Sequence, residues 1–509
     1  MRHSMHHTES PGVKIRSLKT LLSCLIVCTL GHVTQVSADQ AILIGGGPNL
    51  NKTPVQIEQN VAWVQGILDK NDLRVSTFFT DNDQTTADVF YRFEEDEAAE
   101  YKEFDLYARA LEPLARIYGE QDLNALRTRS NNIENLSGGT DATDLSTSIA
   151  QLLRENPEKS NLLIFNGRGH RNNGSNEQPS LALWNNTQMS VAELHSLLDN
   201  ASTPIRFVMT QCQSGSFHRL AYKDPAQGLT LAENKRCGFT ASSVYSDSEV
   251  CTKFVNESDY RDYSTYFFAA LDGYDRDGEI LALDPDRNQD GQITLREAHF
   301  YSMQEAHSID LSRSSSEDFL QQWEPWYLKW ASANQNLPNN EYAKLFRTTA
   351  DKHNVSLDNN TAKTIRSELM SLEQETLSLQ KQRDELESSI EKLQSQIISD
   401  ASVRWPSLLG PYTAGYQSLA ASGELLVISD WISKQAIYAD VLNAQRDSKL
   451  LEEAMLDNQR QETRMRKLLH FRELANLKEH LYQYGSNDDI QSYENLVSCE
   501  DTPLNISKR

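Results

Sequence analysis

The sequence predicts an α/β protein in which a mainly parallel sheet is flanked by helices and followed by an all-α, coiled-coil C-terminal region. Three observations lead to this prediction. Short apolar runs end abruptly in small or polar turn residues, stretches with helical spacing separate these runs, and a heptad spacing of apolar residues begins after residue 350. Strands that alternate with helices are typical of parallel sheets covered on both faces.

The strands and helices are expected in alternation along residues 40–243. The expected strands are Gln40–Ile44, Leu73–Phe79, Asn161–Phe165, Leu181–Trp184, Ile205–Thr210 and Gly238–Ser243. The expected helices are Thr53–Asp69, Asp144–Asn156 and Ser190–Leu198. Ser190 followed by Glu193 forms a capping-box pattern at the start of the last of these helices. Residues 85–125 are polar and acidic with helical spacing, which indicates an insertion.

The C-terminal third shows the spacing of a coiled coil between residues 350 and 400. Thr376 and Arg383 are polar interruptions of an a/d seam that runs through Ile365, Leu369, Leu372, Leu379, Leu386, Ile390, Leu393 and Ile397. A single long helix packed on its own domain is the alternative. A second helical region, 401–490, either folds back antiparallel on the first or extends a dimer, so self-association through the coiled coil is one expectation.

The N-terminal residues 1–38 are predicted to be a signal peptide. Lys14, Arg16 and Lys19 precede a short apolar core, Leu21–Leu30, and the small residues before Asp39 fit a cleavage site. We therefore expect an exported protein, either periplasmic or secreted. No later segment is apolar enough to predict a transmembrane helix.

The charge balance bears on the kinds of partner. Lys and Arg number 49 against 72 Asp and Glu, which gives a formal net charge of −23. Such a charge argues against nucleic acid and anionic membrane surfaces as partners. It is spread along the chain, so solubility explains it more simply than a specific partner does.

Four cysteines follow the predicted signal peptide, and an exported protein permits disulfides. Cys237 and Cys251 could pair across a short loop. This pairing would leave Cys212 as a candidate free thiol, and Cys499 is the fourth cysteine. Pairing cannot be deduced from the sequence alone.

Two of the expected strands end in residues suited to nucleophilic catalysis. The strand 205–210 runs into Cys212, and the strand 161–165 runs into a segment that ends at His170. Because active sites lie beyond the carboxyl ends of parallel strands, these two residues are expected at one edge of the sheet. A cysteine with a histidine base suggests acyl transfer by a thiolate.

Residues 286–297 match the calcium-binding loop of an EF-hand at its diagnostic positions. The sequence predicts a Ca²⁺ site with oxygen ligands from Asp286, Asn288, Asp290, Gln292, Thr294 and Glu297. Gly291 supplies the sharp turn, and Gln292 would contribute its backbone carbonyl. The alternative is an acidic turn before a helix.

Several segments together resemble the caspase/legumain type of cysteine peptidase, in particular its exported bacterial legumain-like branch. The segments that carry the resemblance are Ala41–Gly47, the glycine- and histidine-containing strand end at 167–170, Leu183–Asn185, Val208–Phe217, Phe239–Ser242 and Tyr263–Leu271. The resemblance implies a caspase-like domain over about 39–345, a nucleophile at Cys212, a histidine base on the neighbouring strand and an oxyanion donor at Gly169. It also implies a peptide or protein substrate.

The chain departs from the family pattern at one position. Arg168 stands where the family has its histidine, Gly169 keeps the glycine, and His170 comes two residues late. Two functions follow as expectations. One is an exported cysteine endopeptidase that uses His170 as its base and carries a structural calcium site. The other is a catalytically degenerate, calcium-binding module that serves protein interaction or assembly.

Overall fold

The computed structural model describes residues 38–503 except for 72, 84, 93–101, 119–125, 156, 158, 171–178, 245, 250–259, 327, 329–336, 359 and 409–413. The chain divides into two units, Met1–Gln35 and Val36–Arg509, and everything described here belongs to the second. The predicted signal peptide therefore lies outside the described residues except for Ala38.

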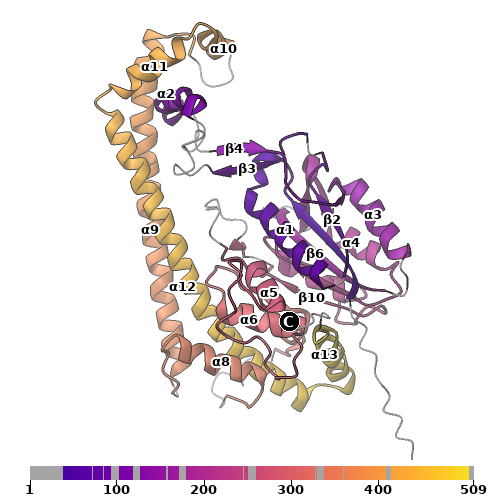
Figure 1. Cartoon of the computed structure of the whole chain (residues 1–509). Coiled ribbons are helices and arrows are strands. Elements are labelled where there is room, and N and C mark those ends of the chain that lie inside the picture. The colour runs from indigo at the N-terminus through magenta and orange to yellow at the C-terminus, as the bar shows by residue number, and fades with distance from the viewer. Residues whose placement is uncertain are drawn as a thin grey trace, which may run out of the picture. The chain divides into compact units, whose positions relative to one another are not determined.

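A mainly parallel sheet forms the centre of the α/β region (Figure 1). Its strands run in the spatial order β5-β2-β1-β6-β9-β10-β11, and β11 alone in this order is antiparallel to its neighbour in the described chain. Their bounds are β1 Ala38–Gly46, β2 Arg74–Phe79, β5 Leu136–Gly138, β6 Ser160–His170, β9 Ile205–Met209, β10 Arg236–Thr240 and β11 Arg313–Ser314. The end of β6 also pairs antiparallel with β7 (Ser180–Leu183), which pairs with β8 (Thr187–Ser190). The predicted α/β class with a mainly parallel sheet is confirmed.

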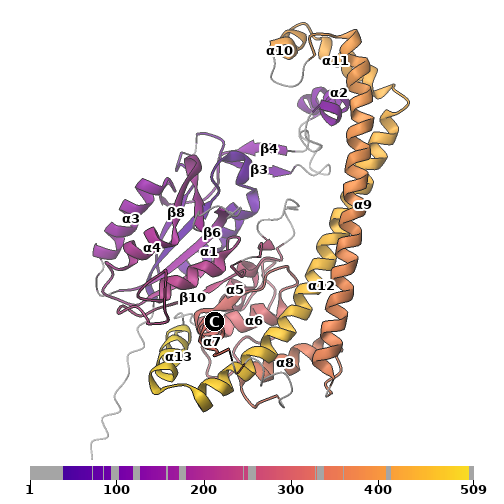
Figure 2. The ribbon, with the colours of Figure 1, turned by 180° about the vertical axis from the view of Figure 1, so that it is seen from behind.

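Helices cover both faces of this sheet, as Figure 2 shows from behind. Leu43 and Ile164 share one apolar core with α1 (Val55–Lys70), α5 (Tyr263–Asp272) and α6 (Leu295–Glu305). Ile44 and Phe165 point to the other face and share a core with α3 (Ala142–Glu155) and α4 (Val191–Leu198). This alternation follows from the two-residue period of a strand, and it makes the central strands apolar on both faces.

The capping box predicted at the start of α4 is present. The Ser190 side chain accepts from the backbone N–H of Glu193 at 3.2 Å, and the Glu193 carboxylate accepts from the backbone N–H of Ser190 at 2.7 Å. Two orphan N–H groups are satisfied in this way, and the helix begins where the sequence places it.

The described part of the predicted insertion at 85–125 contains a strand and a helix, and another short strand follows the insertion. These are β3 (Val89–Arg92), α2 (Lys102–Tyr118) and β4 (Leu126–Arg129), and the two strands pair antiparallel. Leu114 and Ile117 of α2 enter an apolar cluster with Ile397, Ile428 and Val441 of the C-terminal helices. The insertion is therefore held by a part of the chain about 300 residues away in sequence.

Two long helices dominate the C-terminal region, and they lie side by side in both ribbon views. They are α9 (Thr361–Arg404) and α12 (Tyr438–Tyr484). The Asn458 amide donates to the Leu372 carbonyl at 2.7 Å, while Ile397 of α9 packs near Val441 of α12, so the helices run antiparallel. Of the two predicted arrangements, the structure has the second helical region folded back on the first.

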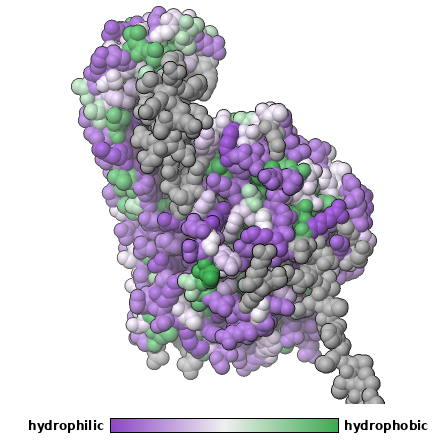
Figure 3. Space-filling view, viewed as in Figure 1, coloured by the Kyte–Doolittle hydropathy of each residue, from purple (hydrophilic) through white to green (hydrophobic). Residues whose placement is uncertain are grey.

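Shorter helices complete the described chain. They are α7 (Ser315–Trp323), α8 (Glu341–Lys352), α10 (Ala414–Ala421), α11 (Glu424–Ser433) and α13 (Asn487–Glu500), with the 3-10 turns η1 (Leu50–Lys52), η3 (Trp184–Asn186) and η4 (Ser214–Ala221). The face shown in Figure 3 is mainly hydrophilic, with hydrophobic residues in scattered spots. None of the described helices combines the length and hydrophobicity needed to cross a bilayer.

Candidate functional site

The two strand ends singled out in the sequence lie next to each other in the sheet. β6 and β9 are parallel neighbours, with Phe165 opposite Met209. The backbone N–H and the hydroxyl of Thr210 both donate to the Phe165 carbonyl at 3.1 Å, so the contact continues past the end of β9. β9 itself ends at Met209, and Cys212 lies in the turn that follows it.

A network of short polar contacts fixes the turn that carries Cys212. The backbone N–H of Ser214 donates to the Ser242 hydroxyl at 3.1 Å, and the backbone N–H of Ser242 donates to the Ser214 hydroxyl at 3.0 Å. Gln213 has a φ of 57°, in the left-handed region that a non-glycine residue rarely adopts. Strain of this kind persists where surrounding contacts determine the backbone, and it is enriched at functional sites.

Gly169 packs directly against the Cys212 backbone. A Cβ atom at this position would lie 2.3 Å from the Cys212 carbonyl oxygen and 3.1 Å from Cγ of Gln211. Only glycine permits such an approach, since the closest real Cβ contacts are longer than 3.0 Å. Gly169, expected as an oxyanion donor beside the histidine base, therefore lies against the Cys212 backbone.

His170 is the last residue of β6 and is exposed. The strand is unbroken to this residue, and Arg168, Gly169 and His170 pair in register with Ala182, Leu181 and Ser180 of β7. Residues two apart on an extended strand lie on the same face, and their Cα atoms are about 6–7 Å apart. Arg168, at the position of the family's histidine, therefore lies one strand repeat before His170 on the same face of β6.

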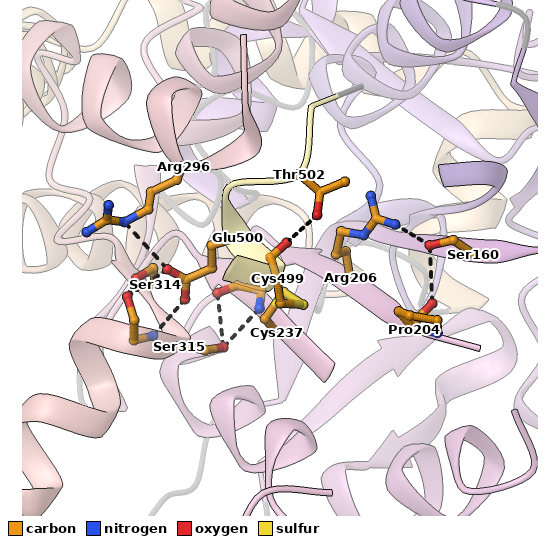
Figure 4. The surroundings of a disulfide bond; sticks show 12 residues. Ser160, Pro204, Arg206, Cys237, Arg296, Ser314, Ser315, Cys499, Glu500 and Thr502 are labelled. Atoms are coloured by element: carbon orange, nitrogen blue, oxygen red, sulfur yellow. Dashed lines mark hydrogen bonds and ion pairs between the residues drawn. A yellow bond between two sulfur atoms is a disulfide. The ribbon is translucent and has the colours of Figure 1, made fainter. Parts of the chain in front are cut away.

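The sulfur chemistry differs from the prediction. Cys212 is disulfide-bonded, with a partner outside the described residues, so it is not the free thiol expected from the sequence. Cys237 pairs with Cys499 across 262 positions, with Cα atoms 6.0 Å apart, and not with Cys251 (Figure 4). The prediction failed because short sequence separation does not select disulfide partners when α13 folds back to the sheet.

Arg168 carries an uncompensated charge. Its side chain is largely shielded from solvent, yet part of the residue stays accessible. Burial lowers the pKa of its guanidinium to about 10, and no charged group of the described chain contributes to the shift. Among the described residues its buried Nε atom donates to no acceptor. An unpaired buried charge is costly, so this arrangement is unusual for a purely structural residue.

Gln211 is a second polar residue at this edge that sequence reasoning missed. Its side chain is fully buried, and neither its amide nitrogen nor its amide oxygen has a hydrogen-bond partner in the described chain. Buried amides are nearly always paired. The only sequence signal was its place immediately before Cys212, which does not reveal burial.

The predicted calcium loop has a compact, internally bonded shape. The Asp286 carboxylate accepts from the backbone N–H groups of Asp290 at 3.2 Å and of Gly291 at 2.9 Å. At the other end, the Glu297 carboxylate accepts from the backbone N–H groups of Arg287 at 2.9 Å and of Asn288 at 3.3 Å. The acidic residues at positions one and twelve therefore both turn back onto the loop backbone.

A helix, α6, starts inside the loop 286–297, at Leu295. Gly291 has a φ of 89°, which allows the sharp turn, and Ile293 is buried in the main core. Thr294 caps α6 through a capping box with Glu297. Oxygen donors suit Ca²⁺, and the six residues that would hold the ion are Asp286, Asn288, Asp290, Gln292, Thr294 and Glu297. Among the described residues, however, no group of three His, Cys, Asp or Glu side chains is arranged to bind a metal ion.

The fold places this chain in the class of α/β proteins with a mainly parallel sheet and a long helical C-terminal region. No protein-family model matches the chain, and no curated protein matches it either. Its function must therefore be argued from the site itself.

Proposed function

We propose that this protein is an exported, legumain-type (caspase-like) binding module that does not cleave peptides and that carries an EF-hand calcium site. The single observation that carries the proposal is the disulfide at Cys212. A sulfur held in a disulfide is not a thiolate, and only the thiolate is a nucleophile.

Arg168, which stands at the position of the family's histidine, also argues against catalysis. A general base must lose its proton near the working pH. With a pKa of about 10, only roughly one Arg168 in a thousand is neutral at pH 7. Arg168 therefore cannot accept the thiol proton as the family's histidine does, although it can bind an anionic group.

Calcium fits this proposal as a stabilising ligand. The loop 286–297 leads directly into α6, whose first turn contacts the C-terminal segment through a bridge between Thr294 and Pro503. An ion held by this loop would fix that junction. Extracellular sites of this kind bind in the range of about 0.1–1 mM, which suits permanent occupancy outside the cell.

The long helices suit an assembly role. Thr376 and Asn458 meet inside the seam between α9 and α12, where a polar pair sets register at some cost in stability. We propose that this helical hairpin presents a partner surface.

The test is a peptidase assay on the purified protein with fluorescein-labelled casein, before and after mild reduction by a phosphine. We expect no turnover in either state, and no labelling of Cys212 by iodoacetamide until the protein is reduced. Turnover by the reduced protein that disappears in a Cys212→Ser variant would overturn the proposal.

A cysteine endopeptidase is the second candidate, and the contact between Gly169 and the Cys212 backbone favours it. In this function Cys212 is the nucleophile of the reduced protein, His170 the base and Gly169 the oxyanion donor. Iodoacetamide labelling of reduced wild type and of His170→Ala separates the candidates. Slower labelling of the variant supports the peptidase, and equal rates support the binding module.

A further inference from the structure

Arg168 lies at the functional edge of the sheet with a charge that nothing in the described chain neutralises. It is the third-last residue of β6, and the next residue, Gly169, packs against the Cys212 backbone. Its Nε atom has no acceptor in that part of the chain, and burial alone accounts for the lowered pKa. Open-sheet proteins bind ligands at this edge.

The edge is accessible from outside and closed further in. His170 is exposed, Gly169 and Arg168 are partly accessible and Gly167 is buried, so accessibility falls along these four successive positions of the strand. Beyond Arg168, Gly169 is in contact with the Cys212 carbonyl. A ligand group that reaches the guanidinium would therefore lie next to this packed backbone.

We propose that Arg168 anchors a binding site for the carboxylate of a peptide, with the free C-terminal carboxylate as the preferred source. This inference rests on the proposed binding function and names its ligand class. A guanidinium binds a carboxylate through two parallel hydrogen bonds, which makes the pair strong and directional. Capture of a chain terminus is one of the recurring ways in which proteins recognise peptides.

The charges near Arg168 and on the whole chain favour a ligand group with a single negative charge. One guanidinium is present, and no second cation of the described chain affects its pKa. The net charge of −23 repels highly charged anions such as nucleotide phosphates. The unpaired amide of Gln211, which borders the same glycine, adds unused hydrogen-bonding capacity to the edge.

The experiment compares three probes by isothermal titration with the full-length protein. They are an N-acetylated Gly-Gly-Ala peptide with a free C-terminus, the same peptide as its C-terminal amide, and an N-acetylated Gly-Asp-Ala amide whose carboxylate is on a side chain. We expect the free acid to bind at least about tenfold more tightly than the amide. Tighter binding of the aspartate peptide assigns the carboxylate to a side chain, and equal binding of all three overturns the proposal.

Two variants and a control test the role of the guanidinium. Arg168→Met should abolish the preference for the acid and raise the melting temperature by about 2–4 °C, because an unpaired charge is removed. Arg168→Lys keeps the charge but should weaken acid binding, since it lacks the paired donors. Arg446→Met, at an exposed position of α12, should change neither property.

A purely structural role gives the opposite pattern. Arg168→Met would then lower the melting temperature and leave the acid preference intact. The outcome is independent of the peptidase assay: a protein that cleaves casein yet prefers the acid probe refutes the proposed function and supports this site.

Discussion

Cys237 of β10 and Cys499 of α13 are joined by a disulfide, which fastens the last helix of the chain to the central sheet. Next to it, the Glu500 carboxylate accepts from the backbone N–H of Ser316 at 2.6 Å and so caps the start of α7 (Figure 4). Two residues further, the backbone N–H of Leu295 donates to the Thr502 carbonyl at 3.4 Å. The C-terminal segment thus contacts the sheet, α7 and the end of the loop 286–297 in succession.

The first prediction concerns this disulfide. A cross-link between residues 262 positions apart removes much of the freedom of the unfolded chain. Replacing both partners, Cys237→Ala with Cys499→Ala, should lower the free energy of unfolding by about 3–5 kcal/mol. Urea denaturation measures the change. Reductant should shift the midpoint of the wild type more than that of the double variant, and equal shifts would contradict the prediction.

The fold could be predicted from the sequence because its signals are local. Strand β9 is a short apolar run that ends at a turn, and α4 has its capping box at Ser190 and Glu193. The antiparallel return of α12 onto α9 was one of two arrangements compatible with the heptads. Sequence spacing fixes which face of a helix is apolar but not which helix covers it.

The candidate site could be predicted only in part. The two neighbouring strand ends follow from motif order. The disulfides and the unpaired Arg168 do not, because they depend on contacts between distant segments. No local pattern tells a solvated arginine from a buried one.

A buried histidine makes stability depend on pH. His218 is almost fully buried, and its Nε2 lies 3.0 Å from the Thr240 hydroxyl. Burial lowers its pKa from 6.5 to about 4, despite the opposing effect of nearby Asp318. The fold therefore favours neutral imidazole: the stability from this group is complete above pH 6.5 and is lost as the pH falls towards 4.

A His218→Gln variant should lose less stability on acidification than the wild type. The difference between pH 7 and pH 4 should shrink by up to about 3 kcal/mol, since the variant has no proton to take up. Urea denaturation at both pH values measures it. His170→Gln, at an exposed position, serves as control, and a His218→Gln profile parallel to that of the wild type refutes the explanation.

Calcium should stabilise the protein through the loop 286–297. With a dissociation constant of about 0.1–1 mM, 2 mM Ca²⁺ should raise the free energy of unfolding by about 1 kcal/mol. Glu297→Gln should remove this gain, because it deletes a ligand charge but keeps the cap of α6. Chelator-treated protein titrated with Ca²⁺ gives the measurement, with Glu385→Gln on exposed α9 surface as control. An unchanged gain in Glu297→Gln would place any bound ion elsewhere.

The polar contact inside the helical hairpin gives a further prediction. The buried Asn458 amide donates to the Leu372 carbonyl at 2.7 Å and to the Thr376 hydroxyl at 2.8 Å. Asn458→Ala should lower the free energy of unfolding by about 1–3 kcal/mol, because buried acceptors lose their donor. Lys449→Ala on the exposed face of α12 should stay within about 0.5 kcal/mol of wild type. Similar effects of the two variants in urea denaturation would exclude a role for this contact.

Two glycines allow a matched test of the contact at the site. A methyl group at Gly169 would overlap the Cys212 carbonyl, whereas one at Gly66, inside α1, would meet nothing within 4 Å. Gly169→Ala should therefore destabilise the protein by about 1–3 kcal/mol, and Gly66→Ala should stabilise it by about 0.5–1 kcal/mol. The same Gly169 substitution should also speed the reduction of the Cys212 disulfide, because the strand end must move away from the turn. Reduction followed by alkylation and mass spectrometry reports this rate. A Gly169→Ala protein with wild-type stability and reduction rate would mean that the two strand ends are not held in contact in solution.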